Sequence, residues 1–171
     1  MTAAPSSGVF AHLRANRLAI VGATAVIVVD QVVKVWVRHD IPEGSARQFL
    51  PSIDLVRTRN TGVSFGILNS APPWVVGLVS TVALVAVLSL VFGLLPGRVR
   101  QFAAALIVGG ALGNLIDRIA LGSVTDFLDL PLLPPCNVAD IAITFGAIAM
   151  AIGLLLSGIS ERTTAQAGDE A

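Results

Sequence analysis

WVVGLVSTVALVAVLSLVFGLL, residues Trp74 to Leu95, contains no charged side chain. At about 1.5 Å of rise per residue, a helix of this length crosses a hydrocarbon core about 30 Å thick. The whole chain agrees with this pattern, since 54% of its 171 residues are hydrophobic and 13% are charged. Soluble domains carry about 25% charged residues. The sequence therefore predicts an integral membrane protein.

Three further apolar runs are long enough to span a bilayer. They extend from Leu18 to about Val37, from near Phe102 to Ile119, and from Val138 to about Ile159. Lipid offers the backbone no hydrogen-bond partner, so each run is predicted to be a helix. We expect a mainly α, integral membrane fold with four transmembrane helices, at about 18–37, 74–95, 102–119 and 138–159.

The remaining chain divides into two tails and one larger connection. Residues 1–17 and 160–171 are polar, and we expect little fixed structure in them. Residues 38–73 form the only sizeable segment outside the predicted spans, and Ile53, Leu55 and Arg57 alternate with their neighbours as in a strand. A small β-rich unit is therefore predicted between the first and second helices.

The unusual polar residues are predicted to gather on one side of the membrane. An up-and-down bundle places the end of the first helix, the end of the third helix and the start of the fourth on the same side. The polar residues at these three ends are Asp30, Lys34, Asn114, Asp117, Arg118 and Asp140. Asp126 lies in the short connection between the last two ends. Such convergence indicates a functional site at that face.

The distribution of arginines does not decide which side this is. Five arginines lie toward each side, counted over the tails and connections. Arg98 and Arg100, in a very short turn, favour placing that turn in the cytoplasm.

Asp126 and Asp140 form the most informative pair. Two carboxylates brought together cannot both ionise cheaply, so they share a proton and titrate as a unit. Aspartic proteases use this arrangement, in which one carboxylate takes a proton from water while the other polarises the scissile carbonyl. The pair could equally line a cation or proton path, or Asp140 could cap its helix. Spacing alone leaves these alternatives open.

Two other patterns lie on predicted helices. Asp30 and Lys34 are four residues apart, so they can form an ion pair across one turn. Such a pair is more typical of structure than of catalysis. Gly110, Asn114 and Arg118 repeat every four residues on one stripe. This stripe could hold a loop or a substrate backbone by hydrogen bonds, or it could serve helix packing.

The composition excludes several other classes of site. The net charge is zero, so no nucleic-acid partner is indicated. One cysteine, Cys136, excludes an intramolecular disulfide, and two histidines, His12 and His39, cannot build a typical zinc site. We therefore expect neither a metal nor a cofactor.

Five motifs together resemble one family, lipoprotein signal peptidase, the bacterial signal peptidase II. They are DQVVK (Asp30–Lys34), RNTGVSFG (Arg59–Gly66), GGALGNLIDR (Gly109–Arg118), VTDF (Val124–Phe127) and NVADIAI (Asn137–Ile143). The resemblance covers about residues 18 to 157, in the order and spacing of the family.

The resemblance implies a four-helix aspartic endopeptidase of the bacterial inner membrane. Both termini would be cytoplasmic, and the site would face the outer side beneath a β-rich cradle formed by residues 38–73. Its partners would be membrane lipid and a prolipoprotein whose lipobox cysteine carries a diacylglyceryl group, with cleavage just before that cysteine. Oligomeric state is not implied.

The resemblance also assigns residues. Asp126 and Asp140 match the catalytic pair of the family. The positions that match its supporting residues are Asp30, Lys34, Asn60, Gly110, Asn114, Arg118, Asn137 and Ala139. The main alternative is a small ion or proton transporter that uses the same carboxylates, although the second helix offers only Ser80, Thr81 and Ser89 for a polar path.

Overall fold

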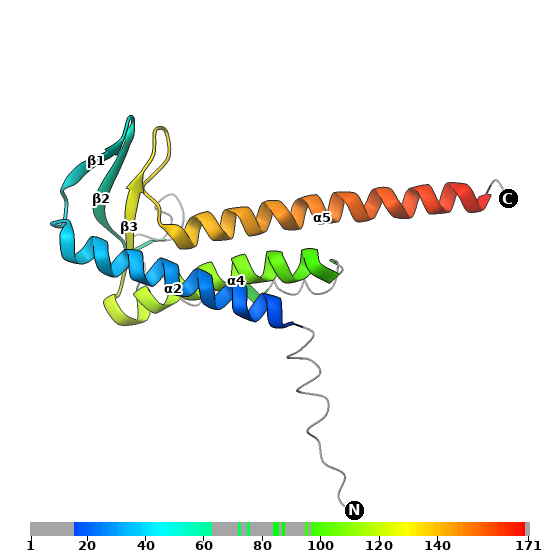
Figure 1. The fold of residues 1–171 in the computed structure, drawn as a ribbon, viewed down its shortest axis with the longest axis horizontal. Coiled ribbons are helices and arrows are strands. Elements are labelled where there is room, and N and C mark those ends of the chain that lie inside the picture. The colour runs from blue at the N-terminus through cyan, green and yellow to red at the C-terminus, as the bar shows by residue number, and fades with distance from the viewer. Residues whose placement is uncertain are drawn as a thin grey trace, which may run out of the picture.

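The computed structural model describes residues 16–62 and 97–169, together with residues 72, 75, 84, 85, 87 and 95. The predicted helix 74–95 lies almost wholly outside these residues. Three long helices are described: α2 (Arg17–Asp40), α4 (Gly97–Leu121) and α5 (Val138–Asp169). A three-stranded sheet lies across one end of them (Figure 1).

All three described helices can span a membrane. The spans are Arg17–Asp40, Gly97–Leu121 and Val138–Ser157, each long and apolar enough to cross a bilayer. The sequence-based helices at 18–37, 102–119 and 138–159 are thus confirmed, with α2 and α4 extending one to five residues further at each end than predicted. The protein is a multi-pass membrane protein.

Helix α4 packs against both other helices, and small residues allow the close approach. The Cβ that an alanine would add at Gly109 would come within 2.8 Å of the carbonyl oxygen of Ala23 on α2. A Cβ at Gly110 would collide with the carbonyl oxygen of Ala139 on α5. Because lipid tails are as apolar as leucine, helices in a membrane associate mainly by such close packing.

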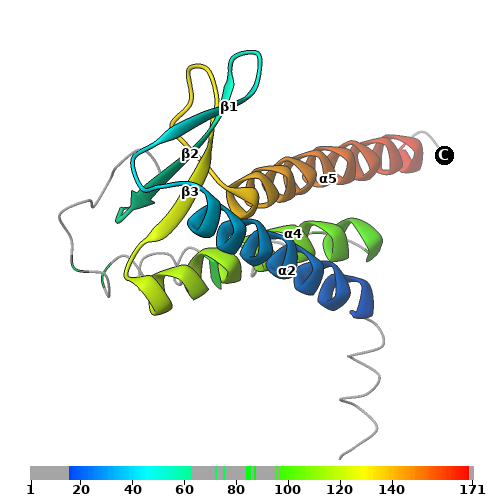
Figure 2. The same cartoon turned by 60° about the vertical axis from the view of Figure 1, so that its left-hand side comes forward.

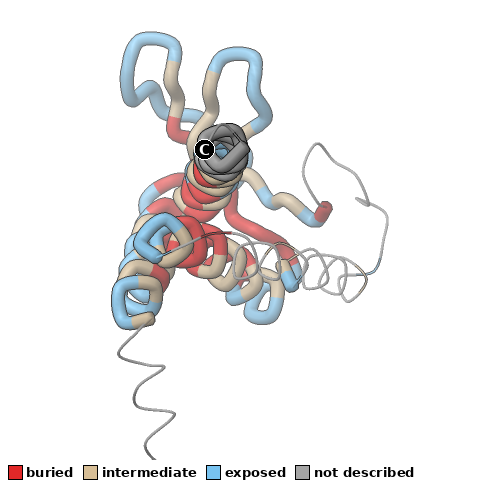
Figure 3. The backbone as a smooth tube through the Cα atoms, turned by 90° about the vertical axis from the view of Figure 1, so that its right-hand side faces the viewer, coloured by how far each residue is buried: buried red, intermediate tan, exposed pale blue. Residues whose placement is uncertain are grey.

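Burial follows this arrangement. The buried residues gather where the helices face each other and where the sheet meets them, while the outer surfaces are exposed (Figure 3). Many exposed side chains are large and apolar, among them Val21 and Val32 of α2 and Phe145 and Leu155 of α5. Outward-facing apolar side chains are typical of helices that contact lipid.

The sheet is antiparallel, in the order β1–β2–β3. Its strands are β1 (Ala46–Leu50), β2 (Ile53–Asn60) and β3 (Val124–Asp129). The strand predicted from Ile53 onward is confirmed as β2. The sheet is nevertheless larger than predicted, because β3 comes from the connection between α4 and α5.

The sheet rests on the C-terminal end of α2 (Figure 2). Val37 and Ile41 pack there against Leu55 of β2 and Phe127 of β3. This small apolar core fixes β3 beside the ends of the helices. It therefore positions the residues that β3 carries.

The expectation of an unstructured C-terminal tail at 160–171 is wrong. Helix α5 continues through Asp169. The segment ERTTAQAGD, residues 161–169, contains no proline, and alanine, glutamate, arginine and glutamine are good helix formers. Nothing in it stops a helix that a long apolar span has already nucleated.

Candidate active site

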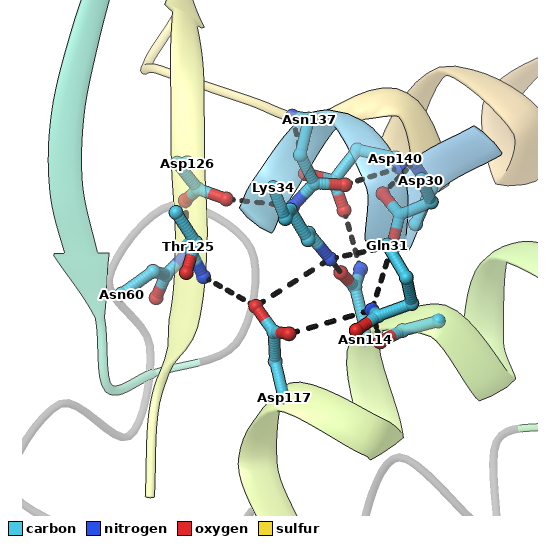
Figure 4. Close-up of polar contacts among 12 residues, drawn as sticks. Asp30, Gln31, Lys34, Asn60, Asn114, Asp117, Thr125, Asp126, Asn137 and Asp140 are labelled. Atoms are coloured by element: carbon cyan, nitrogen blue, oxygen red, sulfur yellow. Dashed lines mark hydrogen bonds and ion pairs between the residues drawn. The ribbon is translucent and has the colours of Figure 1, made fainter. Parts of the chain in front are cut away.

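Asp126 and Asp140 are brought together by β3 and the first turn of α5 (Figure 4). Asn137 bridges them. Its side-chain Nδ2 donates to Asp126 Oδ1 at 2.7 Å, and its backbone N–H donates to Asp140 Oδ2 at 3.2 Å. The two carboxylates that the sequence analysis paired therefore share one hydrogen-bonding neighbour, which is itself fully buried.

Asp126 is almost completely buried, with 3% of its surface exposed. Burial raises the pKa of its carboxyl group to about 6, and the negative charge of Asp140 contributes to the rise. Hydrogen bonds from the amides of Asn60, at 2.9 Å, and Asn137 act in the opposite direction, because they favour the ionised carboxylate. Asp126 can thus hold a proton at mildly acidic pH.

Asp140 is held by a reciprocal cap at the start of α5. Its backbone N–H donates to Asn137 Oδ1 at 3.0 Å, while its carboxylate accepts the Asn137 backbone N–H. This is the geometry of a capping box. The carboxylate also accepts a hydrogen bond from Asn114 Nδ2 at 2.8 Å. Helix capping, one alternative from the sequence, is therefore real, and it fixes the direction in which Asp140 points.

A buried ion pair supports this arrangement from α2. Lys34 Nζ lies 2.8 Å from Asp30 Oδ2, and both side chains are fully buried. The predicted pairing across one helical turn is confirmed. Lys34 also donates to Asn114 Oδ1 at 2.8 Å, so Asn114 connects the lysine to Asp140. Asp30 Oδ1 in turn accepts the backbone N–H of Ala139 at 2.9 Å.

Removing one partner of this pair should be costly. Lys34→Met should lower the free energy of unfolding by about 3–5 kcal/mol, because it leaves Asp30 buried without its cation. Adding Asp30→Asn to Lys34→Met should recover part of the loss. Unfolding in detergent, followed by circular dichroism, measures both. Arg47→Met, on exposed β1, removes the same charge and should cost less than about 0.5 kcal/mol. Equal losses in the two single variants would contradict the role of the buried pair.

The stripe on α4 faces the site as predicted, but its members make different contacts. Gly110 lies against the backbone of Ala139, which keeps α5 close to α4. Asn114 lies between Lys34 and Asp140. Arg118 Nη2 donates to the carbonyl oxygen of Gly62 at 3.1 Å. Of the alternatives left open by the sequence, Arg118 thus holds a loop in this structure, and Gly110 serves helix packing.

Asp117, predicted only to be one of the polar residues that converge on this face, is a centre of contacts. It is 1% exposed and accepts the backbone N–H of Thr125, the residue before Asp126, at 2.9 Å. Lys34 lies 3.7 Å and Arg38 3.4 Å from its carboxylate, and Gln31 donates to it at 3.4 Å. An acidic residue inside a membrane helix could have signalled this role.

The other candidate groups, Asp129 and Cys136, take no part in the side-chain hydrogen bonds that hold the pair. Asp129 faces Asp54 across the β2–β3 ladder, near the far end of β3. Burial raises the pKa of the Cys136 thiol to about 11, so this cysteine is a poor nucleophile. Among the residues that the structure describes, no three histidine, cysteine, aspartate or glutamate side chains could hold a metal ion.

Comparison with known proteins gives a consistent result. The family model described as signal peptidase (SPase) II matches residues 22–156. A lipoprotein signal peptidase of Bartonella henselae is 35% identical over 85% of this chain and 93% of its own length. One from Tolumonas auensis is 38% identical over 74% and 82%, respectively.

Solved structures show the same likeness. Two chains, each described as a bacterial membrane enzyme, superpose with TM-scores of 0.71 and 0.68 at 30% and 32% identity. The first match covers 82% of this chain and 88% of the other, and the second covers 80% and 92%.

Proposed function

Because the chain belongs to the signal peptidase II family, we propose that Asp126 and Asp140 are the catalytic residues with which it cleaves signal peptides from prolipoproteins. The family establishes a membrane-bound bacterial peptidase with prolipoprotein substrates. The observation that supports an aspartic mechanism is the bridge through Asn137, which holds one buried and one half-buried carboxylate on a single neighbour.

In the proposed reaction, the pair shares one proton. Asp126, with its pKa raised to about 6, carries that proton and donates a hydrogen bond to the scissile carbonyl oxygen. Asp140, fixed by Asn114 and Asn137, accepts a proton from water as the water oxygen attacks the carbonyl carbon. The amine of the new N-terminus then leaves with a proton, and both products depart with the pair again holding one.

The topology also supports a fourth transmembrane helix. Helices α2 and α4 both end beside the sheet, so they run in the same direction (Figure 1). The chain between them must return to the opposite side before α4 begins. Residues 74–95, apolar and uncharged, are suited to that crossing. The start of α2 and the end of α5 lie away from the sheet, and we assign both termini to the cytoplasm and the site to the outer side.

The site's position suits a substrate anchored in lipid. Asp140 stands at the end of a span and not in its middle, so water can reach it from the aqueous side. A diacylglyceryl-modified prolipoprotein diffuses in the plane of the bilayer and can enter between helices. We assign cleavage to the bond just before the modified cysteine.

A direct assay tests this function. Purified protein, incubated with a diacylglyceryl-modified prolipoprotein, should give a shorter product on a gel. The competing hypothesis, a carboxylate-based ion or proton transporter, predicts gradient-driven uptake into vesicles instead. Uptake without cleavage would refute the proposed function.

The pKa of Asp126 predicts a pH dependence. Above about pH 6 the pair loses its shared proton, so kcat/KM should fall as the pH rises through that region. Asn60→Leu removes a hydrogen bond that favours the ionised form, so it should move the fall to higher pH. Initial rates between pH 4 and 9 measure the shift. A fall that moves to lower pH in Asn60→Leu would contradict the assignment of the proton to Asp126.

A further inference from the structure

A small cavity lies between the sheet and the C-terminal ends of α2 and α4. It is on the face of the sheet opposite to the Asp126 side chain. Its volume is about 150 Å³, and its lining includes the side chains of Arg38, Arg57 and Arg59. Side chains alternate between the two faces of a strand. Arg59 pairs with Thr125, which also lines the cavity, whereas the neighbouring Asp126 carries the contacts of the active site.

The cavity has an excess of positive charge. Arg57 Nη1 donates to the carbonyl oxygens of Arg38 and Ile41, at 2.9 and 3.3 Å. Arg59 donates to the carbonyl oxygen of Leu121 at 3.2 Å and to the Ser123 hydroxyl. These partners are neutral, so they orient the guanidinium groups without cancelling their charge.

Little in the lining offsets this charge. Glu43, half exposed, contributes one carboxylate, whose Oε2 is 4.0 Å from Arg57 Nη2. Arg38 is balanced by Asp117 at 3.4 Å. Within the described lining, two guanidinium groups therefore face the cavity with a single solvated carboxylate as their anionic partner.

The cavity lies at the end of a helix that is long and apolar enough to span a membrane. Leu121, the last residue of α4, lines it and is 42% exposed. Ile119, two residues earlier, is 79% exposed. Exposed apolar residues on a spanning helix mark its contact with acyl chains, and the phosphate groups of phospholipids lie at the level where such contacts stop.

We propose that this cavity binds the phosphate group of an anionic phospholipid in the leaflet on the side of the sheet. Arginine is suited to phosphate because its planar donors form two parallel hydrogen bonds. A volume of 150 Å³ matches about five waters at roughly 30 Å³ each, enough for a phosphate group. It is below the range of roughly 300–1,000 Å³ that is usual for larger ligands.

Binding at this cavity would reach the active site through Arg38. This side chain donates to Thr125 Oγ1 at 3.0 Å and contacts Asp117, which holds the backbone of Thr125. An occupied cavity would therefore stiffen β3 next to Asp126. The inference uses only the sheet and the helix ends, so it stands apart from the assignment of the catalytic pair.

The test is phospholipid binding to the purified full-length chain in detergent. Native mass spectrometry with added phosphatidylglycerol should show one retained lipid. The double variant Arg57→Gln, Arg59→Gln should lower its affinity at least tenfold. The matched variant Arg47→Gln, Arg98→Gln makes the same charge change at exposed positions outside the cavity and should bind as the unaltered chain does. Circular dichroism confirms that each variant is folded.

Two further measurements test the source of the phosphate and the role of the positive charge. Inorganic phosphate at the same concentrations should bind far more weakly, since it has no acyl chains. The double variant Arg57→Lys, Arg59→Lys keeps the charge and should recover part of the affinity if it folds. Equal lipid binding by the glutamine variant and its matched control would overturn the proposal. Inorganic phosphate binding as tightly as the lipid would overturn the phospholipid as the ligand.

Discussion

Replacing Asp126 or Asp140 by asparagine should lower the rate of signal-peptide cleavage by at least about 10³-fold, within the range that loss of a general acid or base produces. Asparagine keeps the size of the side chain but cannot hold or accept the shared proton. In the proposed reaction, Asp126→Asn removes the group that polarises the carbonyl, and Asp140→Asn removes the acceptor of the proton from water. The measurement is the initial rate on a modified prolipoprotein.

Asp129 supplies the matched control. It lies three residues after Asp126 on the same strand, but it faces Asp54 across the ladder and is partly exposed. Asp129→Asn should therefore keep most of the activity. The double variant Asp126→Asn, Asp140→Asn should be no slower than either single one, because the two residues act as a unit. Full activity in Asp126→Asn would show that another group performs the chemistry.

Folding must be separated from chemistry in this comparison. Asp140 caps α5 through Asn137, so its replacement could also loosen the helix start. An asparagine oxygen can still accept the Asn137 backbone N–H. The unfolding of Asp140→Asn should therefore remain cooperative. A variant that unfolds normally and does not cleave places the loss in the chemical step.

Much of the fold could be predicted because its signals are local. The apolar runs that became α2, α4 and α5 are set by length and composition, which lipid converts directly into helices. The pairing of Asp30 with Lys34 depends only on helical spacing. Because consecutive helices reverse direction, Asn114 at the end of one and Asp140 at the start of the next are predicted to lie on the same side. In the structure, Asn114 Nδ2 lies 2.8 Å from Asp140 Oδ1.

The features that escaped prediction depend on contacts between distant segments. The sequence around Val124 gives no sign that β3 pairs with β2, about 65 residues earlier, since strand pairing depends on which edge is available. The role of Asp117 has the same origin, because Thr125 and Arg38 reach it only in the folded chain. The length of α5 escapes prediction because a polar segment at a chain end is typical of disorder as well as of an exposed helix, and here the residues favour a helix.

The reciprocal cap at Asn137 could be predicted only in part from the sequence. An Asn followed three residues later by an acidic residue, before an apolar run, is a local signal for a helix start. It predicts that Asp140 caps α5, and it does so correctly. It cannot predict that the amide of Asn137 also reaches Asp126. The local signal therefore supports one role for Asp140, and only the folded structure reveals its neighbour.

Lipidation of the substrate should also change the rate of cleavage strongly. A precursor that carries the diacylglyceryl group should be cleaved at least roughly 10²-fold faster than the same precursor with a bare cysteine. Each buried methylene contributes about 0.8 kcal/mol, and each 1.36 kcal/mol changes a rate about tenfold. Four methylenes that become buried only as the complex forms would suffice. The measurement is kcat/KM on the two matched substrates.

The variant Arg118→Ala separates positioning from lipid recognition. Arg118 donates to the carbonyl oxygen of Gly62 and so holds the chain that follows β2 next to the active site. Its loss should slow cleavage of the modified substrate by about 10–100-fold, as misplacement of a reacting group does. The helices should stay inserted, and the preference for the lipidated precursor should persist, because the proposed mode of entry places the acyl chains between helices and not on Arg118. If the unaltered chain cleaves both precursors at equal rates, lipid is not recognised, and entry of the substrate from the bilayer loses its support.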